Sequence, residues 1–486
     1  MKKRIIFIVC ALLIFIGSLA QAQEKNQQGE QTATGDLSAE SGVDRLHFKN
    51  VYLTFGGFFE STGLFRSANE NSDVGSTYRD IPLNGTANSK LTEFRGTARQ
   101  SRISLMAETE VMGKKVTGYY ETDFLGAATT ANETESNSWT PRLRQVWTTI
   151  DFPSGFSITT GQAWSLLTTH RNGLRPKAEF IPATIDAQYV VGYNWARQWQ
   201  LRFVQDFGGG VFGAVSLENP ETNTTGVVTP TLCAAAAPTY PCINGLSGSN
   251  NAGSPSSLLN ANTVSTDIAP DVVGKMVFEP GWGHWELKAL GRAFRTRLSA
   301  GQFNGTNRLA FGGGVGMAAL LPLAPTLTLV VEGLAGAGIG RYASAQGPDV
   351  IVRADGTPKA IRAGQLLAGL EWHPTSAWDI YTYNGLEYYE RTVDGGIGYG
   401  SQAQTNASCI GENPTFAGGD GKCASNKSVY QTQNGFWYRF FKGKEGTAAL
   451  GLSYSYTHRQ LWSDAAGQEL RGGEHVAMTS FRYYLP

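Results

Sequence analysis

Basic side chains recur at alternate positions of short segments whose apolar and polar residues alternate in the way typical of β-strands. Because successive side chains of a strand point to opposite faces, these basic residues share the polar face. Others lie in one long connection, residues 165–197, which is rich in ionisable residues. The candidates are Arg102, Arg142, Arg144 and Arg202 in the strand-like segments and His170, Arg171, Arg175 and Lys177 in the connection. Arginine and lysine that line a narrow passage favour anions, and this is the chemistry we expect of them.

Two acids lie among these bases. Glu121 and Asp123 occupy a neighbouring segment and face the same side as the arginines. The sequence therefore leaves two interpretations open: the bases attract anions, or acids and bases pair across a wall and keep its interior wet. We interpret His170 as a solvated loop histidine rather than as a ligand of a metal.

Catalysis would need a nucleophile, a base and a group that orients the base. The chain has only 6 histidines, and none lies in a recognisable nucleophile motif. The patterns GxSxG and HExxH and a glycine-rich phosphate loop are absent from the sequence. Glu121 and Asp123 resemble an acid pair, but acids on a polar wall are ordinary. We expect no enzyme activity, no cofactor and no metal.

Four cysteines form two local pairs, Cys233 with Cys242 and Cys409 with Cys423, each within one long connection. In an exported chain such pairs predict disulfides that staple loops. Metal binding is the alternative, but neither a CxxC motif nor a nearby histidine supports it.

The elements that must position these residues are strands of about ten residues, and no convincing amphipathic helix accompanies them. Sixteen such segments are predicted, at residues 51–66, 100–111, 115–125, 141–152, 156–164, 198–207, 211–218, 268–279, 284–295, 307–320, 326–337, 361–372, 377–389, 430–441, 446–458 and 474–485. Short and long connections alternate between them, with tight turns such as MGKK at 112–115. Alternating strands satisfy every backbone group in a membrane only by closing into a barrel. We therefore predict an all-β fold, a transmembrane antiparallel barrel with short periplasmic turns and long extracellular loops.

The faces of individual strands follow from the same alternation. In 448–457, for example, leucines and tyrosines share one face and Gly451, Ser453 and Ser455 the other, which predicts an interior with room. Aromatic residues near strand ends are expected to form interfacial belts, as is typical of such barrels. They are Trp147, Trp199, Trp372, Trp378, Tyr388, Tyr389 and Trp437.

The N-terminal residues have the pattern of an export signal. Residues 1–22 begin with Lys2, Lys3 and Arg4, continue with an apolar run and end on Ala20-Gln21-Ala22, which predicts a cleaved export signal. Residues 23–50 are polar and are expected to form a flexible periplasmic segment, and 51–486 to form the barrel. Lys and Arg total 40, as do Asp and Glu, and this balance argues against a nucleic-acid partner.

Two stretches, 97–126 and 143–167, resemble the DcaP-like outer-membrane porins. Three motifs carry the resemblance: Arg99-Gln100-Ser101-Arg102, the run from Glu121 to Gly126 and the run from Gly161 to Ser165. The resemblance covers about the first third of the barrel, and beyond residue 210 only the architecture matches. It implies a sixteen-stranded trimeric porin, a lumen narrowed by inward-folded loops and a preference for small anionic solutes such as dicarboxylates.

Together these patterns predict a bacterial outer-membrane porin, a passive channel for small hydrophilic solutes that favours anions such as small carboxylates. Its expected partners are those solutes, outer-membrane lipids and two further copies in a homotrimer. The alternative is a closed barrel that acts as a hydrolase, an adhesin or a structural protein. An energised receptor is a poorer fit, because barrels of that class need 22 strands and a plug.

Overall fold

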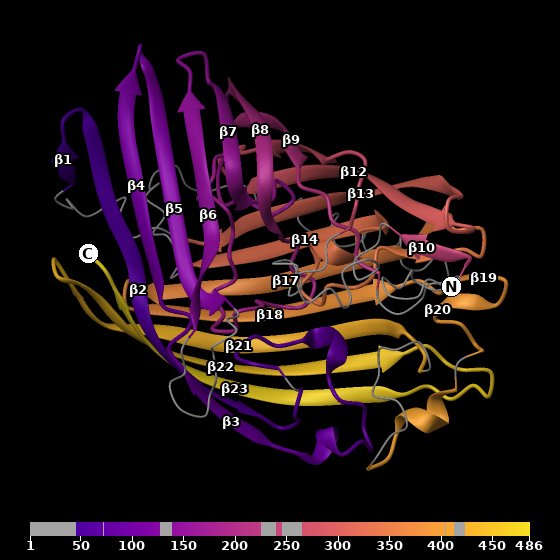
Figure 1. The fold of residues 1–486 in the computed structure, drawn as a ribbon. Coiled ribbons are helices and arrows are strands. Elements are labelled where there is room, and N and C mark those ends of the chain that lie inside the picture. Colours follow the sequence, from indigo (N-terminus) through magenta and orange to yellow (C-terminus); the bar gives the residue numbers. More distant parts are fainter. Residues whose placement is uncertain are drawn as a thin grey trace. The chain divides into compact units, whose positions relative to one another are not determined.

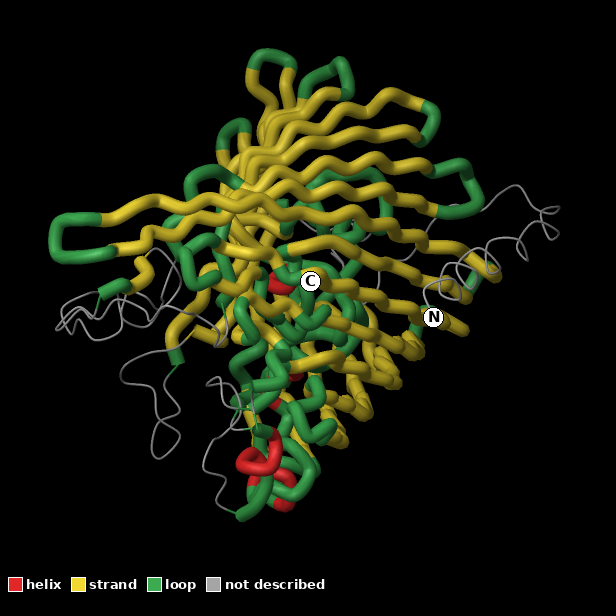
Figure 2. Tube along the Cα trace, turned by 90° about the vertical axis from the view of Figure 1, so that its right-hand side faces the viewer, coloured by secondary structure: helices red, strands yellow, loops and turns green. Residues whose placement is uncertain are grey.

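The computed structural model describes residues 45–70, 72–126, 139–224, 240–244, 265–403, 405–412 and 423–486. All of them belong to one compact unit, 32–486. Strands make up most of the unit, and Figure 2 shows helix only as a few short turns. No helix in the described ranges is long and apolar enough to cross a membrane. The predicted signal, 1–22, and most of the predicted segment 23–50 lie outside the described residues.

Sixteen antiparallel strands close into a barrel (Figure 1). They are β2 (Val51–Arg66), β4 (Arg102–Val111), β5 (Lys114–Gly126), β6 (Thr140–Asp151), β7 (Phe156–Trp164), β8 (Arg197–Gly208), β9 (Val211–Glu218), β11 (Asp271–Phe278), β12 (His284–Ser299), β13 (Gly305–Ala324), β14 (Leu327–Ala337), β17 (Arg362–Thr375), β18 (Trp378–Tyr389), β21 (Asn426–Gly443), β22 (Gly446–Leu461) and β23 (Arg471–Tyr484). Each strand pairs with the next in this order. All sixteen predicted strands are confirmed.

The ring closes at β2. Its residues Phe58–Arg66 pair with β23, while its other edge pairs with β4 and with the short β3 (Glu93–Thr97). Both edges of the first strand are thus hydrogen-bonded. Closure leaves the barrel without an open sheet edge, which is the condition for a sheet to span a membrane.

Shorter elements lie at the rims and in the connections. The tight turn after β4 has positive φ at both Met112 (52°) and Gly113 (71°), as a two-residue hairpin requires. One short strand, β1 (Leu46–Phe48), pairs with the start of β2. It lies at the end of the segment 23–50 that we predicted to be flexible, and it forms a hairpin with β2.

The remaining short elements belong to the long connections. They are the strands β10 (Cys242–Asn244), β15 (Val350–Val352), β16 (Pro358–Ala360), β19 (Thr392–Asp394) and β20 (Ile397–Tyr399), and the 3-10 turns η2 (Tyr78–Asp80), η3 (Asn88–Lys90), η4 (Gly340–Tyr342) and η5 (Asn406–Cys409).

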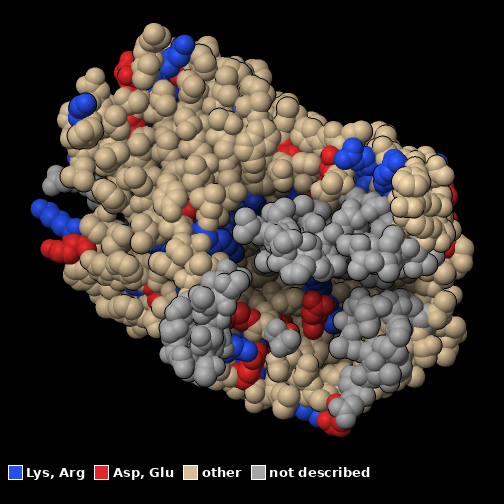
Figure 3. Space-filling view, viewed as in Figure 1, with Lys and Arg blue, Asp and Glu red and all other residues tan. Residues whose placement is uncertain are grey.

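The two faces of the strands differ as the alternation predicts. On β22, Leu450, Leu452 and Tyr454 are exposed on the outer face, and Ser453 and Ser455 are buried on the inner face. The outer surface in Figure 3 is mostly uncharged, and charged side chains gather at the rims and around a hollow.

Three of the seven residues that we predicted for the aromatic belts do not face outward. Trp199, Trp372 and Tyr388 are exposed, but Trp147, Tyr389 and Trp437 are buried on the inner face. Trp437 covers Gly451, where an added Cβ would lie 2.8 Å from the indole ring. The prediction of an open interior at Gly451 was therefore wrong, because the glycine makes room for this indole.

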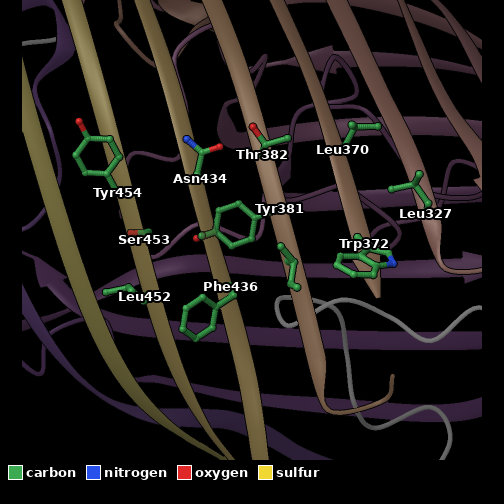
Figure 4. A pocket seen from close by; sticks show the side chains of 12 residues that line it. Leu327, Leu370, Trp372, Tyr381, Thr382, Asn434, Phe436, Leu452, Ser453 and Tyr454 are labelled. Carbon is green, nitrogen blue, oxygen red and sulfur yellow. The ribbon is translucent and has the colours of Figure 1, made fainter. Parts of the chain in front are cut away.

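An apolar groove runs along the outer face over β14, β17, β18, β21 and β22 (Figure 4). Leucines, aromatic rings and the polar Thr382 and Asn434 line it, and it holds no ionisable acid or base. The groove therefore belongs to the outer surface and not to the charged interior.

One predicted disulfide is confirmed. Cys409 and Cys423 are bonded to each other in the connection between β20 and β21. Cys242 is buried in β10, but Cys233 lies outside the described residues, so that pairing stays a prediction.

Closure can be tested by a cross-link between the first and last strands. Thr62 on β2 lies opposite Ser480 on β23, and directly opposed residues have the Cα separation that a disulfide needs. We predict that Thr62→Cys combined with Ser480→Cys yields this disulfide in the folded protein, detected by mass spectrometry of digested peptides. Thr62→Cys with Ser455→Cys, on the next strand, should yield none. A folded double variant without the 62–480 cross-link would contradict closure at this seam.

Candidate functional site

The connection between β7 and β8, residues 165–196, lies inside the barrel; we call it the inner loop. Five wall glutamates accept hydrogen bonds from its backbone N–H groups, and we call them the anchoring glutamates. The bonds are Leu166 to Glu218 (2.8 Å), His170 to Glu286 (2.7 Å), Gly173 to Glu279 (2.7 Å), Gly192 to Glu387 (3.0 Å) and Asn194 to Glu332 (2.9 Å). Because buried N–H groups need acceptors, these glutamates fix the course of the loop.

Apolar residues of the inner loop complete its attachment. Leu166, Leu174, Phe180, Val190 and Tyr193 are fully or almost fully buried. The loop therefore fills a large part of the lumen, consistent with the inward fold that the sequence resemblance implied.

Two predicted pore-lining residues are buried between the inner loop and the wall instead. His170 is fully buried, with Nδ1 3.1 Å from Nζ of Lys275, so the interpretation as a solvated histidine was wrong. Arg202 is also fully buried and donates to the backbone carbonyls of Trp164 and Leu174. Both predictions failed because the apolar residues of the loop cover this wall, which the alternation of single strands does not reveal.

Three predicted bases of the inner loop contact the wall of the barrel. Arg171 makes two hydrogen bonds to Glu371, at 3.0 and 3.1 Å. Arg175 forms an ion pair with Asp151 on β6 at 3.0 Å, and Nζ of Lys177 lies 4.6 Å from the ring centre of Tyr119 on β5. The loop thus crosses the lumen: Arg171 contacts β17, on the side of the anchoring glutamates, whereas Arg175 and Lys177 contact β6 and β5.

Arg142 and Arg144 lie at an irregularity in β6. Glu121 pairs with Gln145 and Thr122 with Leu143, so Arg144 is an extra residue in the ladder. Such a bulge changes the alternation of the strand and redirects a side chain. It brings both Arg144 and Gln145 to the inner face.

The two predicted acids lie directly behind these arginines. Asp123 accepts two hydrogen bonds from Arg142, at 3.0 and 2.7 Å, and one from Arg144 at 2.8 Å. Glu121 accepts from Arg144 at 2.6 Å. Arg102 approaches Glu121 only to 3.8 Å, which exceeds a hydrogen bond. The structure thus brings together five of the predicted residues in one cluster of bases over acids.

The Arg99–Arg102 motif forms a break in the wall. β3 and β4 pair with the same edge of β2 and are separated by residues 98–101. The backbone N–H of Glu60 on β2 donates to Oγ of Ser101 across this break, at 2.9 Å. Arg102 is the first residue after the break, and its guanidinium lies 5.1 Å from the ring centre of Phe58.

The Gly161–Ser165 motif supports the bulge. Nε2 of Gln162 donates to the carbonyls of Leu143 and Arg144, at 3.1 Å each. Gly161 has φ of 123° and lies so close to β6 that a Cβ would meet the carbonyl of Val146 at 2.2 Å. All three motifs that carry the family resemblance therefore build the same corner of the lumen.

A narrow space separates this corner from the inner loop; we call it the aperture. Arg102, Arg144 and Arg482 form its wall face, and Ile181, Ile185, Ala187 and Tyr189 its loop face. Its other lining residues are Phe58, Gln100, Asp123, Leu125, Thr184 and Asp186. The free volume of this space is about 30 Å³, so the two faces lie close together.

Of the residues that line the aperture, the sequence analysis predicted only Arg102, Asp123 and Arg144, and two of those it missed make specific contacts. Arg482 on β23 lies between the rings of Phe58 and Trp437, 4.6 and 4.2 Å from their centres. A lone arginine at an inward position of the last strand was the available signal. Tyr189 has a positive φ of 68° and accepts at its carbonyl from the hydroxyl of Tyr78, at 2.7 Å. No local sequence signal marks this loop contact.

Comparisons with known proteins support the fold. The outer-membrane channel DcaP of Acinetobacter baumannii superposes with a TM-score of 0.62 at 18% identity, over 91% of this chain and 99% of that one. An anion-selective porin from Comamonas acidovorans (9% identity, 90% of this chain, 100% of that one) and OprB of Pseudomonas putida (11%, 89% and 94%) both give TM-scores of 0.46. No protein-family model and no curated protein sequence matches the chain. The chain thus has the fold of the DcaP outer-membrane channel, as its sequence motifs led us to expect.

The anchoring glutamates can be tested at Glu387, which accepts from Gly192 and from Ala345 of another connection. Glu387→Ala leaves two buried N–H groups without an acceptor, so we expect a loss of about 2–4 kcal/mol in stability and larger, noisier conductance in planar bilayers. Glu390→Ala, at an exposed ion pair beyond the same strand, is the control and should change neither. Unchanged stability and conductance of Glu387→Ala would contradict the anchoring role.

Proposed function

We propose that the protein is an outer-membrane porin through which small hydrophilic solutes diffuse passively, with a preference for anions such as small carboxylates. The supporting observation is the position of the bases relative to the acids in the lumen. In four of its ion pairs the cation is the more exposed partner, whereas in Arg144–Glu121 both side chains are buried, at 3% and 7%. The exposed fractions of base and acid are 60% and 11% for Arg175–Asp151, 35% and 1% for Arg142–Asp123, 22% and 1% for Arg171–Glu371 and 21% and 7% for Arg102–Glu121.

This arrangement supports the interpretation in which the bases attract anions. Acids and bases do pair, but the acids lie behind the bases, so a solute meets guanidinium groups first. A low-dielectric passage that presents one sign of charge concentrates the opposite ion. Arg102 is the strongest candidate for binding an anion, because its Nε is buried and has no hydrogen-bond partner among the described residues.

The remaining parts of the proposal concern the setting of the pore. The apolar outer face would contact outer-membrane lipids, and export would use residues 1–22 as a cleaved signal. The resemblance to the DcaP-like porins supports a homotrimer. Transport would need no cofactor and no chemical turnover, because the solute moves down its own gradient.

Ion selectivity tests the proposal. In planar bilayers with a potassium chloride gradient, we expect the zero-current potential of the mature protein to have the sign of an anion-selective pore. A potential of the opposite sign would refute the proposed anion preference.

Arg102→Gln tests the role of this side chain. A positive charge about 4 Å from an anion in a wet passage stabilises the anion by about 1 kcal/mol. Without this charge, the anion-to-cation permeability ratio should fall about fivefold. Arg362→Gln removes an arginine whose side chain is 78% exposed at the end of β17 and should leave the ratio unchanged. Equal ratios for the wild type and Arg102→Gln would exclude Arg102 as a selectivity residue.

A further inference from the structure

The two faces of the aperture differ in chemistry. The wall face carries three guanidinium groups, whereas the loop face is mainly Ile181, Ile185, Ala187 and the ring of Tyr189, with Thr184 and Asp186 as its polar members. The one acid among the loop residues of the aperture, Asp186, is turned away from the arginines. Its carboxylate accepts from the hydroxyl of Ser76 at 2.7 Å and from the backbone N–H of Gln188 at 2.8 Å.

The three guanidinium groups also differ in what they already bind. Arg144 holds Glu121 and Asp123, and Arg482 lies 3.0 Å from Glu60. Arg102 has only a distant contact of 3.8 Å with Glu121. One guanidinium of the three is therefore available to a carboxylate of the solute.

We infer that the aperture favours monocarboxylates with a compact apolar body, such as aromatic or branched carboxylates, over small dicarboxylates. This inference rests on the proposed function and specifies its solute class. The carboxylate binds Arg102, and the apolar body lies against Ile181 and Ile185.

Two physical arguments support this solute class. Because the space between the two faces is narrow, with a free volume of about 30 Å³, a solute that enters it contacts the side chains of the loop face and is covered by them. The apolar surface of the solute is stabilised by this cover, because burial removes that surface from water. The second carboxylate of a dicarboxylate is destabilised by the same cover. It meets isoleucine side chains without a cation, and an unpaired charge is costly to bury.

The experiment compares permeabilities in planar bilayers under bi-ionic conditions, with benzoate, acetate and succinate as probes. In a wide pore, benzoate passes slightly more slowly than acetate because it diffuses more slowly. We expect the benzoate-to-acetate permeability ratio of the wild type to exceed one and the succinate-to-acetate ratio to lie below one. A benzoate ratio at or below one, or a succinate ratio above the benzoate ratio, would overturn the inference.

Two variants with the same substitution locate the effect. Ile181→Thr replaces an ethyl group of the loop face with a hydroxyl and should lower the benzoate-to-acetate ratio at least about fourfold, because more than one buried methylene is lost, with chloride-to-potassium selectivity unchanged. Ile103→Thr changes an exposed isoleucine on the outer face, next to Arg102 in the chain, and should leave both quantities unchanged. Equal benzoate ratios in the two variants would overturn the role of the loop face.

The outcomes separate the inference from the proposed function. Cation selectivity of the wild type refutes the anion-selective pore and the inference together. Anion selectivity with a benzoate ratio at or below one refutes the inference alone.

Discussion

The structure depends on one requirement: a segment that runs through the interior of the barrel must find acceptors for its backbone N–H groups. The anchoring glutamates supply them, from β9, β12, β14, β18 and the end of β11. A carboxylate suits this role because it accepts several hydrogen bonds at once. Two lysines balance the negative charge of two anchoring glutamates. Nζ of Lys275 lies 2.9 Å from Glu286, and Nζ of Lys288 lies 3.6 Å from Glu332. With the loop held in this way, the aperture forms at the opposite wall.

That opposite wall is irregular, and its irregularity serves the site. A regular ladder would present every second residue of β6 to the lumen. The bulge at Arg144 presents two adjacent residues, and the break before Arg102 interrupts the pairing of β2. Bulges of this kind are typical of places where a strand must aim a side chain. Gln162 and Ser101 compensate by bonding to backbone groups that the ladder leaves unpaired.

Much of the fold could be predicted from the sequence, because the alternation of side chains and the turn residues are local signals. Sixteen strands, the inward direction of Arg102, Arg142 and Arg144 and the Cys409–Cys423 disulfide all follow from such signals. What could not be predicted depends on contacts across the lumen. Burial of His170 and Arg202 needs the course of the inner loop, and the inward position of Trp147 needs the bulge, which reverses the alternation after Arg144. Arg482 joins the aperture only because the last strand closes on the first.

The closure of β23 on β2 also has a consequence for assembly. The hydrogen bond from Ser480 to Glu60 joins residues that are 420 positions apart, among the most distant contacts that a chain of this length offers. Contacts of such long range form late, because the entropy of closing a large chain loop opposes them. Until then both terminal strands expose an unpaired edge, which is the feature of a nascent sheet most prone to pair with other chains. Because Arg482 comes from the closing strand, the wall face of the aperture is complete only in the fully assembled barrel, and a barrel whose seam is open would lack this guanidinium.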